Sequence, residues 1–148
     1  MPVNFEKFAQ EANEFLNELA RELGHAGDKE QTLIILRAVL HSLRDRISIA
    51  QSLNLTSSLP TIIRGIYFEH WKYKEPDKYK SLEEFKNAVK AEQRKYGETR
   101  FDWPQSTEEI AAAVFNSLRK YLSEGQIEHI KGELPLEIRE LFEHQEHA

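Results

Sequence analysis

The sequence contains no cysteine, which excludes disulfide bonds, thiolate catalysis and zinc sites built on cysteine. Glycine and proline are scarce, with six and five residues among 148. Leu, Glu, Lys and Ala are plentiful instead, and these residues favour helices. The longest apolar runs fall far short of the roughly 18 residues that a membrane helix needs, and the first ten residues lack the apolar core of a signal peptide. We therefore expect a cytoplasmic, helical protein that does not enter a membrane.

The net charge of −5 disfavours nucleic acid as a partner. The charge is uneven, because residues 72–100 are net basic and residues 101–148 are strongly acidic. Between residues 71 and 80, lysines alternate with Trp71, Tyr73 and Tyr79. Such a segment can stack on bases or grip an acidic partner, or it is a solvated connector between two halves of the chain. We favour the connector.

Apolar residues recur every three or four positions in eight stretches, which is the period of amphipathic helices. The first stretch follows Asn4 as a candidate N-cap and ends at Gly24, a residue suited to the left-handed position after a helix. The later starts are marked by a capping residue followed three positions on by Gln or Glu, or by a Leu-Pro pair. These later starts are Asp28, Ser48, Leu59-Pro60, Ser81, Ser106, Ser123 and Leu134-Pro135.

The second helix, after Asp28, is apolar over more than half of its circumference, so we expect it to be central. The fourth helix, from about Leu59 to Phe68, is expected to bury Ile62, Ile63, Ile66 and Tyr67. A glycine inside a helix costs about 1 kcal/mol relative to alanine. Gly65 therefore predicts close backbone contact with a neighbouring helix.

The two halves of the chain align without gaps at an offset of 75, from about Ala38 to Tyr67. This alignment predicts a duplicated four-helix unit packed about a pseudo-twofold axis, as one compact all-α bundle and a single domain over residues 1–148. Repeat one would span about 4–71, the connector 72–80, repeat two about 81–143, and a flexible tail 144–148. The matching pairs include Ser42-Leu43-Arg44 with Ser117-Leu118-Arg119, Ser48 with Ser123, Leu59-Pro60 with Leu134-Pro135, and Ile63-Arg64 with Ile138-Arg139.

Three stretches also resemble a known family: LRAVLHSLRDRIS at 36–48, LPTIIRGIYFEHW at 59–71, and LRKYLSEGQIEHIKGELPLEIRELF at 118–142. They look like the DUF2267 family, and the resemblance covers nearly the whole chain. It implies a small, all-helical bacterial protein and no assigned activity, so no catalytic residues carry over. The chain departs from the family pattern at Ser57-Ser58, where Ala-Gln is more usual.

The arginines are the first candidate binding residues. Arg44 and Arg119 fall in the last turns of equivalent helices, where a cation stabilises the helix dipole. Arg64 and Arg139 fall in first turns, where a cation is unfavourable to its own helix. We expect each to reach a carboxylate or the free carbonyls of a neighbouring helix end. Binding of an anion between the two repeats is the alternative.

His41, Tyr67 and Trp71 complete the candidate binding residues. His41 lies beside the apolar stripe of the second helix, and we expect it to be a satisfied or partly exposed side chain rather than a ligand. Trp71 belongs with Gly65, Phe68 and His70 to a set whose counterparts in the second half of the chain are Glu or Gln. We expect that set and the basic connector to form any specialised surface.

No phosphate loop, nucleophile elbow or zinc-protease motif is present, and no catalytic residue, metal site or cofactor is predicted. The leading hypothesis is a non-enzymatic interaction or structural module that binds an unknown protein partner or forms a homo-oligomer. The first alternative is a small-ligand or anion-binding module that uses the arginines. The second alternative is an enzyme whose site follows no recognisable motif.

Overall fold

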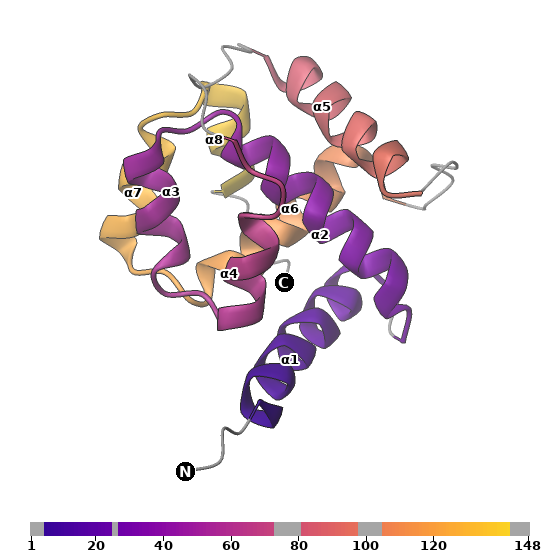
Figure 1. Cartoon of the computed structure of the whole chain (residues 1–148). Helices are drawn as coiled ribbons and strands as arrows, with labels where there is room; N and C mark the ends of the chain where they lie inside the picture. The colour runs from indigo at the N-terminus through magenta and orange to yellow at the C-terminus, as the bar shows by residue number, and fades with distance from the viewer. Residues whose placement is uncertain (1–4, 25–26, 73–80, 98–104, 143–148) are drawn as a thin grey trace, which may run out of the picture.

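The computed structural model describes residues 5–24, 27–72, 81–97 and 105–142. These residues form eight α-helices and no strand, so the predicted all-α class is confirmed (Figure 1). The connector 72–80, apart from Lys72, and the tail 144–148 lie outside the described residues, as does Asn4. The helices are α1 (Glu6–Leu23), α2 (Lys29–Arg44), α3 (Ile49–Thr56), α4 (Thr61–Tyr67), α5 (Leu82–Lys95), α6 (Thr107–Arg119), α7 (Glu124–Lys131) and α8 (Leu136–Phe142).

Local capping fixes most of the helix starts. Five helices begin after a Ser or Asp whose side chain accepts a hydrogen bond from the backbone N–H three residues on, namely α2, α3, α5, α6 and α7. Such a cap satisfies one of the free donors of the first turn. Full capping boxes form at Ser106 and Ser123. Gly24 ends α1 in the left-handed conformation, with φ of 78°, as predicted.

The predicted capping box at Ser48 is only half formed. The Ser48 hydroxyl accepts from Gln51 N–H at 3.2 Å. The backbone N–H and the hydroxyl of Ser48 donate to the Glu133 carboxylate at 2.7 and 2.8 Å. Glu133 comes from the turn after α7, so a carboxylate from the second half of the chain caps α3. This contact, which stabilises the helix N-terminus, helps to hold α3 against α7.

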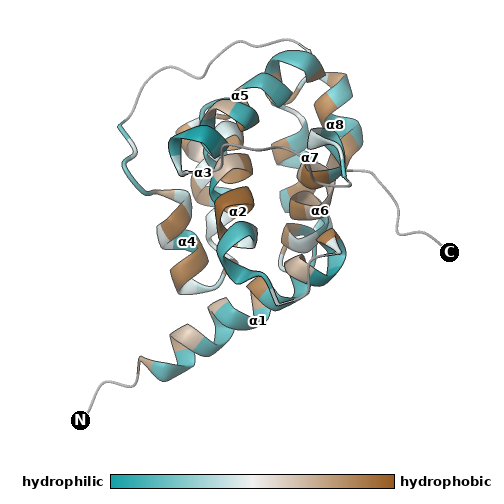
Figure 2. Ribbon diagram, turned by 90° about the vertical axis from the view of Figure 1, so that its right-hand side faces the viewer, coloured by the Kyte–Doolittle hydropathy of each residue, from teal (hydrophilic) through white to brown (hydrophobic). Residues whose placement is uncertain are grey.

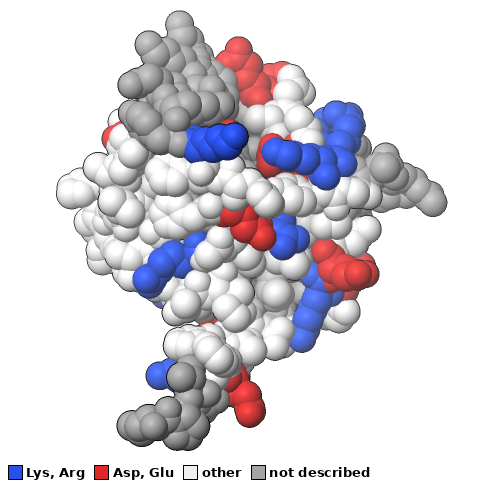
Figure 3. All heavy atoms as spheres, viewed as in Figure 1, with Lys and Arg blue, Asp and Glu red and all other residues white. Residues whose placement is uncertain are grey.

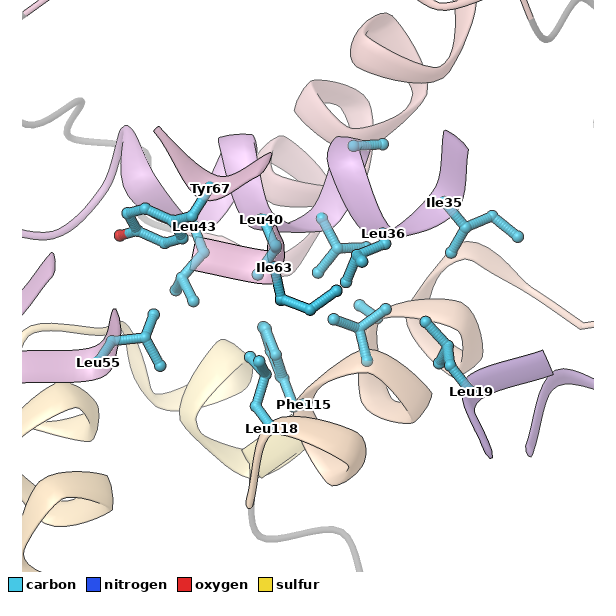
Figure 4. Close-up of a cluster of buried hydrophobic side chains, with 14 of the residues drawn as sticks. Leu19, Ile35, Leu36, Leu40, Leu43, Leu55, Ile63, Tyr67, Phe115 and Leu118 are labelled. Carbon is cyan, nitrogen blue, oxygen red and sulfur yellow. The ribbon is translucent and has the colours of Figure 1, made fainter. Parts of the chain in front are cut away.

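Helix α2 is central, as its broad apolar surface predicts (Figure 1). It packs against α1, α4, α5 and α6. Figure 4 shows Leu36, Leu40 and Leu43 of α2 directed into a cluster with Phe115 and Leu118 of α6, and all five side chains are fully buried. Burying a large apolar side chain stabilises the fold by about 1.5–3 kcal/mol. This cluster joins α2 to α6 in the core, and α4 and α5 also pack on α2.

Two predictions for the fourth helix are wrong. Ile62 is 40% exposed rather than buried. Gly65 has no atom within 4 Å of the place where a Cβ would stand, so the predicted close helix contact is absent. The short helix α4 rests on Ile63, Ile66 and Tyr67, which share one face, and Ile62 and Gly65 therefore point the other way.

The first turns of α1 also differ from the expected pattern. Phe5, at the cap position before α1, is 70% exposed, and Ala9 is exposed. Figure 2 shows the reason, because the N-terminal half of α1 projects beyond the rest of the bundle. The buried stripe of α1 begins only at Ala12 and runs to Leu23.

Several helices of the two halves begin or end at positions that differ by 75 residues, the offset at which the two halves of the sequence align. Helices α3 and α7, and likewise α4 and α8, are separated by that same offset of 75 at both ends. Helices α2 and α6 end at Arg44 and Arg119, which differ by the same number. A duplicated unit related by a pseudo-twofold axis stays a prediction.

Candidate functional site

Arg44 joins the end of α2 to the end of α4. Its Nη1 donates to the carbonyl oxygens of Tyr67 at 2.9 Å and Glu69 at 2.8 Å. Its Nε lies 3.7 Å from the Asp45 carboxylate, and only 9% of the side chain is exposed. The guanidinium therefore satisfies carbonyls at the end of α4 and just after it. Arg119 does the same for α8, because its Nη1 donates to the carbonyl of Phe142.

Arg64 and Arg139 form the second equivalent pair. Nη2 of Arg64 donates to the carbonyls of Ser57 at 3.3 Å and Leu59 at 3.2 Å, just after α3. Nη2 of Arg139 donates to the carbonyl of Leu134 at 3.0 Å. These contacts are the structural pairing that the sequence favours. All four arginines hold helix ends within their own halves of the chain, and whether any of them also binds a ligand stays a prediction.

His41 is 1% exposed and lies between α4 and α5. Its Nε2 lies 2.8 Å from the carbonyl oxygen of Ile66. A carbonyl only accepts, so Nε2 carries a proton. Its Nδ1 lies 3.4 Å from both the Tyr96 hydroxyl and the Glu92 carboxylate. The contact with His41 is the first cause of the lowered pKa of Glu92.

An ion pair extends this network toward the surface. Arg37 donates to both oxygens of the Glu69 carboxylate, at 2.8 and 3.2 Å. The bidentate bond lowers the pKa of Glu69, against the effect of partial burial, and raises the pKa of Arg37. The Arg37 guanidinium also lies 5.4 Å from the centroid of the Tyr96 ring, a cation–π contact. These contacts join α2 to α5 and to the end of α4. We name the five residues that make them the polar clamp: Arg37, His41, Glu69, Glu92 and Tyr96.

Sequence reasoning singled out only His41 of the polar clamp and missed the other four residues. One signal was available. Arg37, His41 and Arg44 are spaced by four and three residues, so they lie on one face of α2. Glu92 and Tyr96 are likewise four residues apart on α5. Nothing in the sequence pairs these two faces, which lie about 50 positions apart in the chain.

Tyr67 is fully buried and its hydroxyl lies 2.6 Å from the Ser52 hydroxyl. Burial raises the pKa of Tyr67, so the phenol stays neutral. Trp71 is half-buried, and its ring lies 5.3 Å from that of Phe68. The structure thus separates the candidate residues, because Tyr67 belongs to the core and Trp71 lies at its edge.

The polar clamp has the composition of a catalytic site but not its accessibility. The imidazole is closed to solvent and both of its nitrogens face protein groups. General acid–base catalysis requires a group that can reach the substrate proton. Among the described residues, no three His, Asp or Glu side chains are grouped to hold a metal ion. The contacts of the clamp join α2, the end of α4 and α5 to one another.

The surface of α3 and α4 is of a different kind. Residues 47–63 carry no Asp, Glu, Lys or Arg in a chain that is 30% charged. Ile49, Leu53 and Ile62 are 38, 57 and 40% exposed. Figure 3, compared with Figure 1, shows a largely white surface over α3 and α4. We name Ile49, Leu53, Ile62 and the exposed Gly65 the uncharged face.

A groove of about 400 Å³ lies beside the uncharged face. The α3–α4 turn forms one wall, the flank of α1 forms another, and Tyr121 contributes its ring. No arginine lines it, which differs from the arginine-lined cleft of the anion-binding hypothesis. Its lining residues are Glu11, Glu14, Ser58, Leu59, Pro60, Thr61 and Tyr121.

Comparison with known proteins identifies the family. None of the described helices is long and apolar enough to cross a membrane. A search of curated proteins finds no match to the chain. The sequence matches the family described as uncharacterized conserved protein, DUF2267, over residues 12–141. This match covers α2 to α7 in full, with most of α1 and of α8. By that match, the chain belongs to the DUF2267 family.

Proposed function

We propose that the chain is a non-enzymatic interaction module that binds a protein partner through the uncharged face. The observation that carries this proposal is the exposure of Leu53, Ile49 and Ile62 within a run that holds no charged residue. Exposed aliphatic residues without neighbouring charges are typical of protein contact surfaces. The cytoplasmic location that the sequence favours and the bacterial source that the family resemblance implies belong to the same proposal.

The second half of the chain provides a comparison. At its equivalent positions, Ile49, Leu53, Ile62 and Gly65 are matched by Glu124, Glu128, Glu137 and Glu140. All four glutamates are exposed on α7 and α8. A helix pair of the same lengths therefore folds with a charged surface, and the aliphatic residues of α3 and α4 are not required by the fold. A contact with another molecule accounts for them.

The partner is a second copy of the chain or another protein. Native mass spectrometry of the full chain purified from its own cells distinguishes the two. We expect wild-type protein to be recovered as an oligomer or with a bound protein. Leu53→Glu, which copies the residue of α7, is expected to be recovered alone, because it places an uncompensated charge within the contact.

His129→Glu is the matched control. It adds the same charge to an exposed position of α7 and should leave the assembly intact. Equal unfolding free energies of wild type and Leu53→Glu exclude misfolding as the cause. Recovery of wild-type protein as a monomer without a partner would contradict the proposal, as would an unchanged assembly in Leu53→Glu.

The anion-binding alternative has weaker support. Guanidinium donors of all four arginines are held by backbone carbonyls, and Arg64 alone of the four is exposed. Its test is Arg64→Ala. Loss of binding to a phosphate-bearing ligand with an unchanged melting curve would favour the alternative over the interaction module.

A further inference from the structure

One flank of α1 carries a row of glutamates. Glu11, Glu14, Glu18 and Glu22 follow a spacing of three and four residues, which places them along one side of the helix. Lys120, just after α6, lies 3.4 Å from the Glu18 carboxylate and 3.3 Å from that of Glu22. The negative charge of Glu18 and Glu22, the C-terminal half of the row, is thus compensated by a lysine of the chain itself.

Glu11 and Glu14, the N-terminal half of the row, have no such cation among the described residues. Among the described residues, no Lys or Arg lies within ion-pair distance of Glu11 or Glu14, and Glu14 accepts only a long hydrogen bond of 3.4 Å from the neutral Gln10 amide. Both glutamates line the groove beside the uncharged face. The pKa of Tyr121 in the same groove is raised, first by burial and then by Glu18 and Glu14, as expected in a negative environment. The groove therefore holds negative charge that the described chain leaves open.

The rest of the lining suits a long basic side chain. Leu59 and Pro60 supply apolar surface, against which the methylene stem of a lysine or arginine can pack. Ser58, Thr61 and Tyr121 line the same space, and a hydroxyl can accept a hydrogen bond from an ammonium or guanidinium donor that the carboxylates do not bind. Two uncompensated carboxylates disfavour an anionic ligand. A volume of about 400 Å³ holds side chains rather than a folded domain.

We propose that the groove receives a lysine or arginine side chain of the protein that docks on the uncharged face. The inference rests on the proposed function, since the α3–α4 turn that walls the groove joins the two helices of that face. Helices α1 and α4 pack against each other, with α1 beside the start of α4 (Figure 1). One partner segment, aliphatic along its length and basic at one end, covers both features. The partner's cation repeats at Glu11 and Glu14 the contact that Lys120 makes at Glu18 and Glu22.

The test uses two short peptides and NMR spectra of the ¹⁵N-labelled full chain. The probes are acetyl-Leu-Lys-Leu-amide and the same peptide with norleucine in place of lysine. We expect the lysine peptide to shift the amide signals of Glu14, Ser58 and Tyr121. Its affinity should fall about tenfold in the Glu11→Gln/Glu14→Gln variant, the loss of one or two charged hydrogen bonds, and should weaken as salt rises.

The control variant is Glu124→Gln/Glu140→Gln, which makes the same charge change at two exposed positions outside the groove. It should bind the lysine peptide as wild type does. Equal shifts from the lysine and norleucine peptides at the groove would overturn the inference, as would unchanged affinity in Glu11→Gln/Glu14→Gln.

The outcomes also separate the two proposals. If assembly in cells is lost in Leu53→Glu but unchanged in Glu11→Gln/Glu14→Gln at every salt concentration, the interaction module stands and the basic subsite fails. If assembly is insensitive to Leu53→Glu, the uncharged face fails as the docking surface, and the partner-bound form of the subsite fails with it.

Discussion

Helices α3 and α4 and helices α7 and α8 share their lengths and their inner contacts but differ on the outside. In both pairs, an arginine from a preceding helix donates to the carbonyl of the last helical residue, Tyr67 or Phe142. In both, a second arginine donates to the Leu carbonyl before the Leu-Pro proline. At positions 49, 53, 62 and 65 the outer residues are aliphatic or glycine in the first pair, and their counterparts in the second pair are glutamates.

The comparison separates two kinds of residue. Residues that recur in the second half of the chain hold helix ends or fill the core, so they serve the fold. The residues of the uncharged face differ from their counterparts and are exposed, and the glutamates at the equivalent positions show that a charged side chain is tolerated there. The fold does not require the aliphatic residues of the uncharged face, because glutamates occupy the equivalent positions of α7 and α8. A function at this surface explains them better.

The largest expected effect concerns the arginines that both pairs share. Arg44→Ala should lower the free energy of unfolding by about 3 kcal/mol, because two carbonyls lose a charged donor in a nearly buried place. Arg119→Ala should cost about half as much, since one such carbonyl contact is seen. Urea denaturation measures both. Losses at both sites below about 0.5 kcal/mol, the least that a typical hydrogen bond contributes, would contradict a shared structural role.

The next effect concerns a difference inside the core. Tyr67 bonds Ser52, whereas the equivalent positions in the second half of the chain are Phe142 and Ile127. Tyr67→Phe should cost about 1.5 kcal/mol and Ser52→Ala about 1 kcal/mol. The double variant should cost about 1 kcal/mol less than their sum, because neither partner is left unsatisfied. Strict additivity in a denaturation cycle would show that the hydroxyl pair contributes nothing.

Acid should weaken the polar clamp, whose Arg37 is matched by Ala112 in the second half of the chain. The folded-state pKa of Glu69 is lowered by Arg37. A lowered pKa stabilises the fold above the unfolded pKa of about 4.3, and the stabilisation disappears as pH falls through the folded value. The free energy of unfolding of wild type should exceed that of Arg37→Met by up to about 1 kcal/mol at pH 7. This difference should shrink below about pH 4. A difference that is constant from pH 7 to 3 would contradict this account.

The smallest effect concerns Gly65, whose counterpart is Glu140. Gly65→Ala should raise the free energy of unfolding by about 0.5–1 kcal/mol, because open space surrounds the new methyl group and helix propensity improves. The melting temperature reports the gain. A loss of stability would show that Gly65 is crowded after all.

Local chemistry made most of the fold predictable. Ser106 and Ser123 specify their caps within four residues, and the breadth of apolar residues on α2 identifies it as central. The sequence was less informative about which side of a short helix is buried and about which residues meet across distant parts of the chain. The sequence of α4 does not say which side faces α2, which is why the predictions for Ile62 and Gly65 are wrong. His41 meets Glu92 and Tyr96 only because α5 packs on α2, and a single sequence does not encode that pairing in any readable pattern.

The most direct test is to give the uncharged face the outer residues of α7 and α8. The variant Ile49→Glu/Leu53→Glu/Ile62→Glu/Gly65→Glu should unfold within about 1 kcal/mol of wild type, because these side chains are exposed and the new acids at positions 49 and 62 lie in first helical turns. Native mass spectrometry of this variant from its own cells should show the chain alone, whereas wild type keeps its partner or second copy. A variant that folds and still carries the wild-type assembly would contradict the assignment of the uncharged face as the docking surface.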